Sequence, residues 1–171
     1  MAIIICYFGK LPWYFDYYVH SCRYNPTIDF YIVTDDSTYA KATPPNLKLI
    51  KKTLSEINIL ATKKLGFLVD IKDSYKLCDF KPTYGVLFSD ILSSYDFWAF
   101  GDIDVIYGNI RNFITEDLLQ NFDLISVRPD WIPGCFLLFR NNEKMNKLYT
   151  HSKDHQKVLT SDIHYCFDET R

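Results

Sequence analysis

Glycine and proline are scarce, with 6 and 7 copies among 171 residues. Collagen-like, low-complexity and linker-like chains need far more of both. An excess of charge of one sign is also missing: 19 basic residues face 21 acidic ones, and no block of five like charges occurs. Proteins that bind nucleic acid ordinarily carry a basic stripe, so we expect no nucleic-acid partner.

Paired cysteines and long apolar runs are lacking as well. The cysteine count is five, an odd number, and no two cysteines have the C-x-x-C spacing. This disfavours a disulfide framework or a structural zinc site and favours a reducing compartment. The apolar run at residues 2–8 has seven members and no basic residue before it. That is too short for a secretion signal or a membrane span. We therefore expect a cytoplasmic protein without a transmembrane segment, for which peripheral membrane association stays open.

Aromatic residues are abundant, at 17% of the chain. Most should fill the core, because aromatic side chains bury large areas, whereas exposed ones often line sugar or base sites. The excess also offers material for a homo-oligomer interface.

The length fits one domain, residues 1–171. Apolar, β-branched or alternating segments predict strands, and segments with helical spacing and end signals predict helices. The expected strands are 2–8, 28–33, 46–51, 95–106, 124–127 and 135–139; the expected helices are 13–22, 55–65, 82–92, 115–120 and 142–151. Their alternation predicts a three-layer α/β fold with a mostly parallel central sheet, in which residues 2–7, 30–33 and 97–100 form neighbouring interior strands.

Asp102 and Asp104 interrupt the apolar segment 95–106. In an extended segment, residues i and i+2 point to the same face, so both carboxylates could hold one Mn²⁺ or Mg²⁺ ion. The D-x-D spacing alone is weak evidence. Its context counts for more, because charged aspartates in an apolar run are costly unless they are paired or bind a cation.

Other polar and aromatic residues follow the predicted strands. Tyr7, Phe8 and Gly9 end the first strand and could line a base pocket, although the glycine pattern of a P-loop is absent. Asp36 ends the second strand and either accepts from a ribose hydroxyl or caps a turn. Lys81 precedes a predicted helix and either reaches a diphosphate or is solvated.

Several segments resemble a known family in the same order along nearly the whole chain. They are KLCDFKPTYG at 76–85, YDFW at 95–98, GDIDVIYGN at 101–109, ICYFGKLP at 5–12, FYIVTDD at 30–36 and PGCFLLFRN at 133–141. The sequence resembles an uncharacterised bacterial glycosyltransferase family, related to the A-type sugar-nucleotide transferases of capsule and lipopolysaccharide synthesis.

This resemblance implies an A-type nucleotide-diphospho-sugar transferase fold and a metal-dependent hexosyltransferase. Such an enzyme moves a sugar from a nucleoside-diphosphate sugar to a glycan or lipid-linked acceptor in surface polysaccharide synthesis. Asp102 would lie nearer the ribose and the metal, and Asp104 would bind Mn²⁺ or Mg²⁺ directly. The resemblance places Tyr7, Phe8, Gly9 and Asp36 around the nucleoside, and Trp131, Gly134, Asp168 and Glu169 on the sugar and acceptor side. The catalytic carboxylates would be Asp104, Asp168 and Glu169, with Asp130 a further candidate base.

The sequence departs from the related transferases in one respect, and two alternative functions stay open. Related transferases often continue well beyond the segment CFDE at 166–169, so we expect a domain that is short at its C-terminus, with intact donor binding and weak transfer. A non-catalytic or truncated nucleotide-binding module is the first alternative. The second is a haloacid-dehalogenase-like phosphatase, which the segment FGDIDV at 100–105 superficially resembles.

Overall fold

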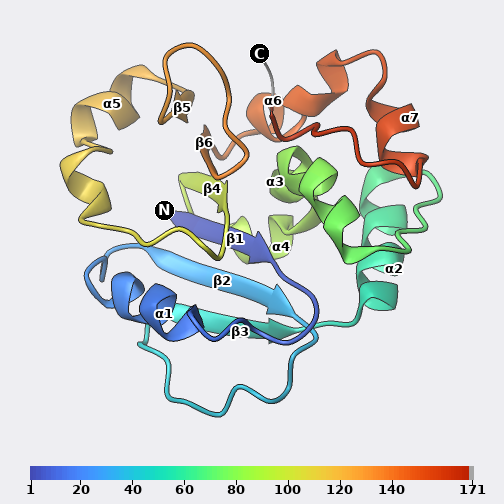
Figure 1. Cartoon of the computed structure of the whole chain (residues 1–171). Coiled ribbons are helices and arrows are strands. Elements are labelled where there is room, and N and C mark those ends of the chain that lie inside the picture. The colour runs from blue at the N-terminus through green and yellow to red at the C-terminus, as the bar shows by residue number, and fades with distance from the viewer. Residues whose placement is uncertain (170–171) are drawn as a thin grey trace.

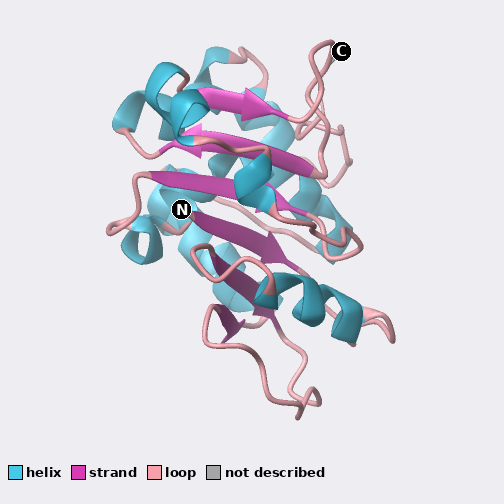
Figure 2. Cartoon of the chain, turned by 90° about the vertical axis from the view of Figure 1, so that its left-hand side faces the viewer, coloured by secondary structure: helices cyan, strands magenta, loops and turns pink. Residues whose placement is uncertain are grey.

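A six-stranded mixed sheet forms the centre of the fold. The computed structural model describes residues 1–169. The strands are β1 (Ala2–Cys6), β2 (Asp29–Thr34), β3 (Leu47–Lys51), β4 (Phe97–Gly101), β5 (Leu124–Ser126) and β6 (Phe136–Arg140), in the order β3-β2-β1-β4-β6-β5. β1 to β4 are parallel, whereas β6 runs antiparallel to both β4 and β5. Figure 2 shows the twisted sheet with helices packed around it.

The predicted interior strands are confirmed. β1 lies between β2 and β4, with Ile3 paired to Phe30 on one side and to Ala99 on the other. Nearly every residue of these three strands is buried, which explains their continuous apolar sequences.

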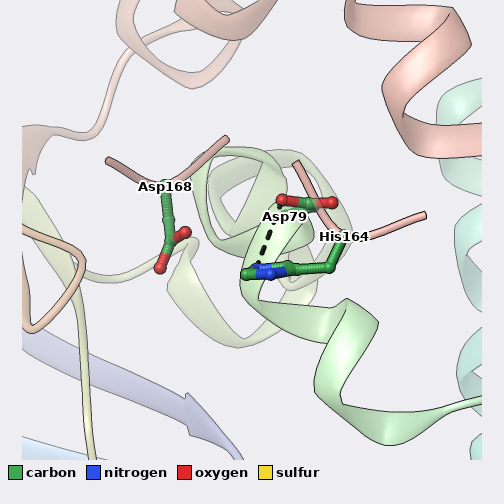
Figure 3. A group of neighbouring side chains, drawn as sticks. All are labelled: Asp79, His164 and Asp168. Carbon is green, nitrogen blue, oxygen red and sulfur yellow. Dashed lines mark ion pairs between the residues drawn. The ribbon is translucent and has the colours of Figure 1, made fainter. Parts of the chain in front are cut away.

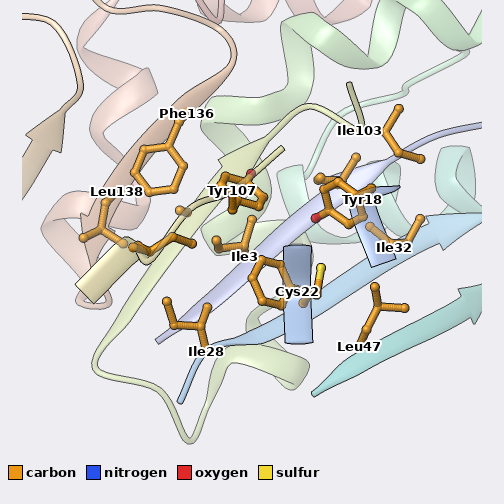
Figure 4. Close-up of a cluster of buried hydrophobic side chains, with 14 of the residues drawn as sticks. Ile3, Tyr18, Cys22, Ile28, Ile32, Leu47, Ile103, Tyr107, Phe136 and Leu138 are labelled. Atoms are coloured by element: carbon orange, nitrogen blue, oxygen red, sulfur yellow. The ribbon is translucent and has the colours of Figure 1, made fainter. Parts of the chain in front are cut away.

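Helical segments cover both faces of the sheet, so the three-layer α/β prediction is also confirmed (Figure 1). One face packs against α1 (Phe15–Arg23), η2 (Ile110–Asn112) and α5 (Glu116–Asn121). Figure 4 shows side chains of the core on this face of the sheet. The other face packs against α2 (Leu54–Leu65), η1 (Ser74–Thr83), α3 (Tyr84–Leu87), α4 (Ser89–Leu92), α6 (Glu143–Asn146), η3 (Leu148–His151) and α7 (His155–Thr160). No helix within residues 1–169 has the length and apolar character needed to span a membrane.

Several predicted helices have other bounds in the structure. The helix expected at 82–92 is helical but divided: η1 runs through Pro82 to Thr83, and two short helices, α3 and α4, meet at Phe88. The helix expected at 142–151 likewise divides into α6 and η3. The N-cap of α2 is Thr53, which forms a capping box with Glu56, and Gly66 ends the helix in the left-handed conformation.

Candidate functional site

A cavity of about 460 Å³ opens beyond the carboxyl ends of β1 and β4. Ligands of α/β sheets commonly bind at this edge. Seven predicted site residues line the cavity: Tyr7, Phe8, Lys81, Asp102, Asp104, Asp168 and Glu169. They come from four separate parts of the chain, which the fold brings to one place.

Asp102 and Asp104 reach the cavity from a turn rather than from an extended strand. β4 ends at Gly101, and the Val105 amide donates to the Asp102 carbonyl across 3.4 Å. The predicted strand 95–106 is therefore wrong beyond Gly101. Ile103 is buried in the core between the two aspartates, so the turn directs an apolar side chain inward and leaves both carboxylates at the cavity.

The two aspartates differ in their surroundings. Asp104 is exposed, and its carboxylate makes no hydrogen bond or ion pair with any residue from 1 to 169. Asp102 is half-buried and accepts from the Lys81 ammonium. Burial raises the pKa of Asp102, and the nearby Asp104 raises it further, while Lys81 acts in the opposite direction.

Lys81 is the buried counter-ion of the site. Its ammonium donates to Asp102 at 2.7 Å, to Asp168 at 2.8 Å and to the Gly134 carbonyl at 2.9 Å. Burial by itself would lower the pKa of Lys81, but the attraction of Asp102 and Asp168 outweighs it and raises the pKa above its ordinary value. The solvated alternative for Lys81 is therefore wrong, because all three donors of the ammonium are used inside the protein.

A second buried ion pair anchors the C-terminal segment. In η1, Lys76 donates to Asp79 at 2.7 Å, to the Val158 carbonyl at 2.7 Å and to the Ile163 carbonyl. Asp79 in turn accepts from the backbone amides of Tyr165 at 2.9 Å and Phe167 at 2.8 Å. The η1 segment thus holds residues 163–168 against the cavity and carries Asp168 and Glu169 there.

Asp79, His164 and Asp168 form a cluster with the spacing of a metal site (Figure 3). The His164 Nε2 atom lies 3.6 Å from the nearer Asp79 oxygen. Both carboxylates are already compensated, Asp79 by Lys76 and Asp168 by Lys81. We assign no metal to this cluster, because a divalent cation would there face two buried ammonium groups.

Gly9 and Asp36 do not line the cavity. Asp36 accepts from the Leu11 amide at 2.8 Å and from both the amide and the hydroxyl of Thr38. Gly9 has a φ of +93° and donates its amide to Asp35. These bonds fix the loop between β1 and α1, so Asp36 fits the turn-cap alternative and not the ribose contact.

Trp131 and Gly134 belong to the loop between β5 and β6. The centroid of the Trp131 ring lies 5.6 Å from the Arg128 guanidinium carbon. Neither Trp131 nor Asp130 is among the residues that line the cavity. Gly134 is buried beside the cavity, where a Cβ atom would collide with an Asp168 oxygen and come within 3.0 Å of a Glu169 oxygen. A side chain at Gly134 would therefore displace the two C-terminal carboxylates.

We expect Gly134→Ala to lower the free energy of unfolding by about 1–3 kcal/mol, because overpacking forces the C-terminal segment away. Gly108→Ala is the matched control, since a Cβ at Gly108 meets nothing within 4 Å. Urea denaturation of both variants measures the difference. Equal stability of the two would contradict the close packing at Gly134.

Some lining residues were not found by sequence reasoning, namely Tyr14, Tyr75, Tyr84, His164 and three cysteines, Cys6, Cys78 and Cys166. Some of them stand in the segments that carry the resemblance, but no role was predicted for any of them, and only the folded loops and η1 bring them together. Burial raises the pKa of Cys6 to about 12 and that of Cys78 to about 11.

These raised values predict slow, strongly pH-dependent alkylation. The thiolate is the reactive form, so below the pKa its fraction rises about tenfold per pH unit. We expect iodoacetamide labelling of Cys78, followed by mass spectrometry, to keep accelerating from pH 8 to pH 10. In urea the same thiol should approach its maximal rate near pH 9, the range of an ordinary cysteine. A plateau near pH 9 in the folded protein would contradict the prediction.

Comparison with known proteins gives a family match. The model of a family described as "Family of unknown function (DUF6625)" matches residues 3–171. No curated protein matches the chain. The family description assigns no chemistry, so the cavity remains the basis for a functional proposal.

Proposed function

The chain belongs to the DUF6625 family, and we propose that it is a metal-dependent glycosyltransferase. It would move a sugar from a nucleoside-diphosphate sugar to a hydroxyl group of a glycan or lipid-linked acceptor in surface polysaccharide synthesis, working in the cytoplasm. The observation that carries the proposal is the cavity itself, where Asp104 and Glu169 are exposed and Tyr7 and Phe8 supply aromatic walls.

The position and size of the cavity support this proposal. It lies at the carboxyl ends of parallel strands, and about 460 Å³ is within the usual range for small-molecule sites. The D-x-D turn follows β4 directly, in a sheet that is mostly parallel. An A-type transferase fold, which the sequence resemblance implies, is consistent with this arrangement.

Asp102 and Asp104 would hold a Mn²⁺ or Mg²⁺ ion. Carboxylate oxygens suit these hard cations, Asp104 is uncommitted among the described residues, and only one oxygen of Asp102 is used by Lys81. When bound, the metal would stabilise negative charge on the diphosphate leaving group.

The other residues have roles that follow from their surroundings. Tyr7 and Phe8 would stack against the nucleoside. Transfer joins an acceptor oxygen to the anomeric carbon and breaks the bond to the diphosphate, which leaves with the electron pair. The acceptor proton needs a base if the configuration is inverted. Glu169 is exposed and fits that role, whereas Asp168 is buried and paired with Lys81, which makes it a positioning residue.

A thermal-shift panel of nucleoside diphosphates and sugar nucleotides, with and without Mn²⁺, tests the proposal. A ligand at about 100 times its Kd should raise the Tm by roughly 5–10 °C, and only when metal is present. Turnover is then followed as release of nucleoside diphosphate. Binding without turnover of any sugar nucleotide would favour the non-catalytic module, and hydrolysis of an aryl phosphate would favour the phosphatase. No shift with any ligand would contradict nucleotide binding altogether.

A further inference from the structure

The outer side of α1 carries a row of exposed rings. The opposite side of this helix is buried in the core, so the row faces away from the sheet. Its members recur every three or four residues, the spacing that places side chains along one side of a helix: Trp13, Tyr17, His20 and Tyr24. We call these four residues the aromatic row. All are exposed, Trp13 by 82%, Tyr17 by 60% and Tyr24 by 64%.

The chemistry of the aromatic row suits the boundary between water and lipid. Single exposed aromatic residues are ordinary, but a row of them on one helix marks an interaction surface. Tryptophan and tyrosine join a large apolar ring to one polar N–H or O–H group, and both gather at the headgroup level of membranes for this reason. An occupant that is apolar on one side and wet on the other therefore satisfies both parts of these side chains.

A basic pocket of about 230 Å³ lies along the same helix. It is lined by Asp16, Val19, His20, Arg23, Tyr39, Lys41 and Ala42, so His20 belongs both to the pocket and to the aromatic row. Lys41 pairs with Asp16. Arg23 is exposed, and its side chain makes no hydrogen bond or ion pair with any residue from 1 to 169. The pocket thus holds an uncommitted guanidinium, the group that binds phosphate oxygens most readily.

The orientation of the rings distinguishes between possible occupants. The Trp13 and Tyr17 rings lie 6.2 Å apart at an angle of 88°, and the His20 and Tyr24 rings lie 5.2 Å apart at 79°. A sugar chain or a run of nucleic-acid bases stacks on ring faces that are turned the same way, which these nearly perpendicular pairs do not offer. Ring edges can instead enter between lipid headgroups, where no common plane is required.

We propose that α1 docks the protein on a bilayer surface that contains anionic phospholipid. The aromatic row enters the headgroup region, and Arg23 binds a lipid phosphate at the mouth of the basic pocket. Trp13 also contacts Tyr14, with ring centroids 5.7 Å apart, and Tyr14 lines the cavity. Docking through α1 therefore brings one side of the cavity close to the membrane. This inference goes beyond the proposed function and does not depend on it.

Co-sedimentation of the full chain with vesicles tests the basic pocket. We expect binding to vesicles that contain phosphatidylglycerol and much weaker binding to pure phosphatidylcholine. Arg23→Glu should lower the affinity for the anionic vesicles by about tenfold or more, because it turns attraction to the surface into repulsion. Lys157→Glu is the matched control, since Lys157 is exposed and lies in the last turn of α7, on the other face of the sheet. Equal binding to both vesicle types, or equal losses in the two variants, would overturn the proposal.

The same assay tests the aromatic row. Tyr17→Ser should lower the affinity by roughly fivefold, because it removes an inserting ring. Phe113→Ser is the control, since Phe113 is 74% exposed but lies outside the row. Circular dichroism of each variant checks that it is folded. A loss in Phe113→Ser as large as that in Tyr17→Ser would contradict docking through α1.

Trp13 supplies a local probe of the bound orientation. Trp98 is fully buried, and Trp131 lies between β5 and β6. Vesicles whose acyl chains carry bromine quench the fluorescence of inserted tryptophans. We expect quenching in the wild type and none in Trp13→Phe, which keeps a ring at this position and retains the other two tryptophans. Quenching that persists in Trp13→Phe would show that another face meets the bilayer.

Two other occupants of the aromatic row give different results. If the wild type is a dimer and Tyr17→Ser makes it monomeric, the row binds a second copy of the chain and the proposal is wrong. If the wild type binds a soluble acidic polysaccharide through Arg23 and does not sediment with vesicles, the partner is a glycan and the proposal is equally wrong. None of these measurements uses a nucleotide or a metal ion, so membrane docking and the proposed function can fail separately.

Discussion

Asp79→Ala should lower the free energy of unfolding by about 3–5 kcal/mol, the usual cost of removing one partner from a buried ion pair. Asp79 is fully buried, pairs with Lys76 and accepts two backbone amides from the C-terminal segment. Alanine would leave the Lys76 ammonium and the amides of Tyr165 and Phe167 without this acceptor. Urea denaturation followed by circular dichroism measures the change.

Asp162→Ala is the matched control for Asp79. Asp162 also pairs with a lysine, Lys72, at 3.1 Å, but both side chains are largely exposed. Exposed pairs contribute at most about 1 kcal/mol, so this variant should remain close to the wild type. Because Asp79 holds residues 163–168, its loss should also make this segment a site of early proteolysis. Similar stabilities of the two variants would refute the anchoring role of Asp79.

The sheet was largely predictable from the sequence, and the helical layer over the cavity was not. The strands β1, β2 and β4 are continuous apolar runs, a direct consequence of burial on both faces. The segment 74–81 lacks a helical repeat of apolar residues, because Lys76, Asp79 and Lys81 are buried in ion pairs rather than solvated. Lys76 and Lys81 are respectively 4% and 6% exposed. Sequence patterns assume that such residues face water, so η1 went unrecognised.

The candidate site was predictable in its carboxylates and less so in its supports. Asp102, Asp104, Asp168 and Glu169 all line the cavity, as the D-x-D motif and the resemblance implied. Their connection through Lys81 could not be inferred, because Lys81 precedes Asp168 by 87 residues and only the folded chain joins them. Asp36 is the opposite case, because it was predicted as a site residue and does not line the cavity. A carboxylate at a strand end suits a ligand and a turn equally well, and local hydrogen bonds decide for the turn.

Asp104→Asn should remove most metal-dependent nucleotide binding. The variant keeps the shape of the side chain and loses the charge that attracts a hard divalent cation. We expect the affinity for the nucleoside diphosphate identified by the panel to fall by roughly 100-fold in Mn²⁺, the upper range for disturbing a metal site. Without metal, the wild type and the variant should bind equally weakly. Isothermal titration calorimetry, with and without Mn²⁺, measures both comparisons.

Asp104 is a cleaner probe than Asp102. Neutralising Asp102 would also remove a partner of Lys81 and disturb Asp168, so lost binding could reflect a displaced segment. Asp104 has no such partner among residues 1–169, and its replacement should change stability by no more than about 0.5 kcal/mol. Asp154→Asn, another exposed aspartate outside the cavity, is the matched control. If Asp104→Asn binds the nucleotide as tightly as Asp154→Asn in Mn²⁺, Asp104 holds no metal and the proposed metal site at the D-x-D turn is wrong.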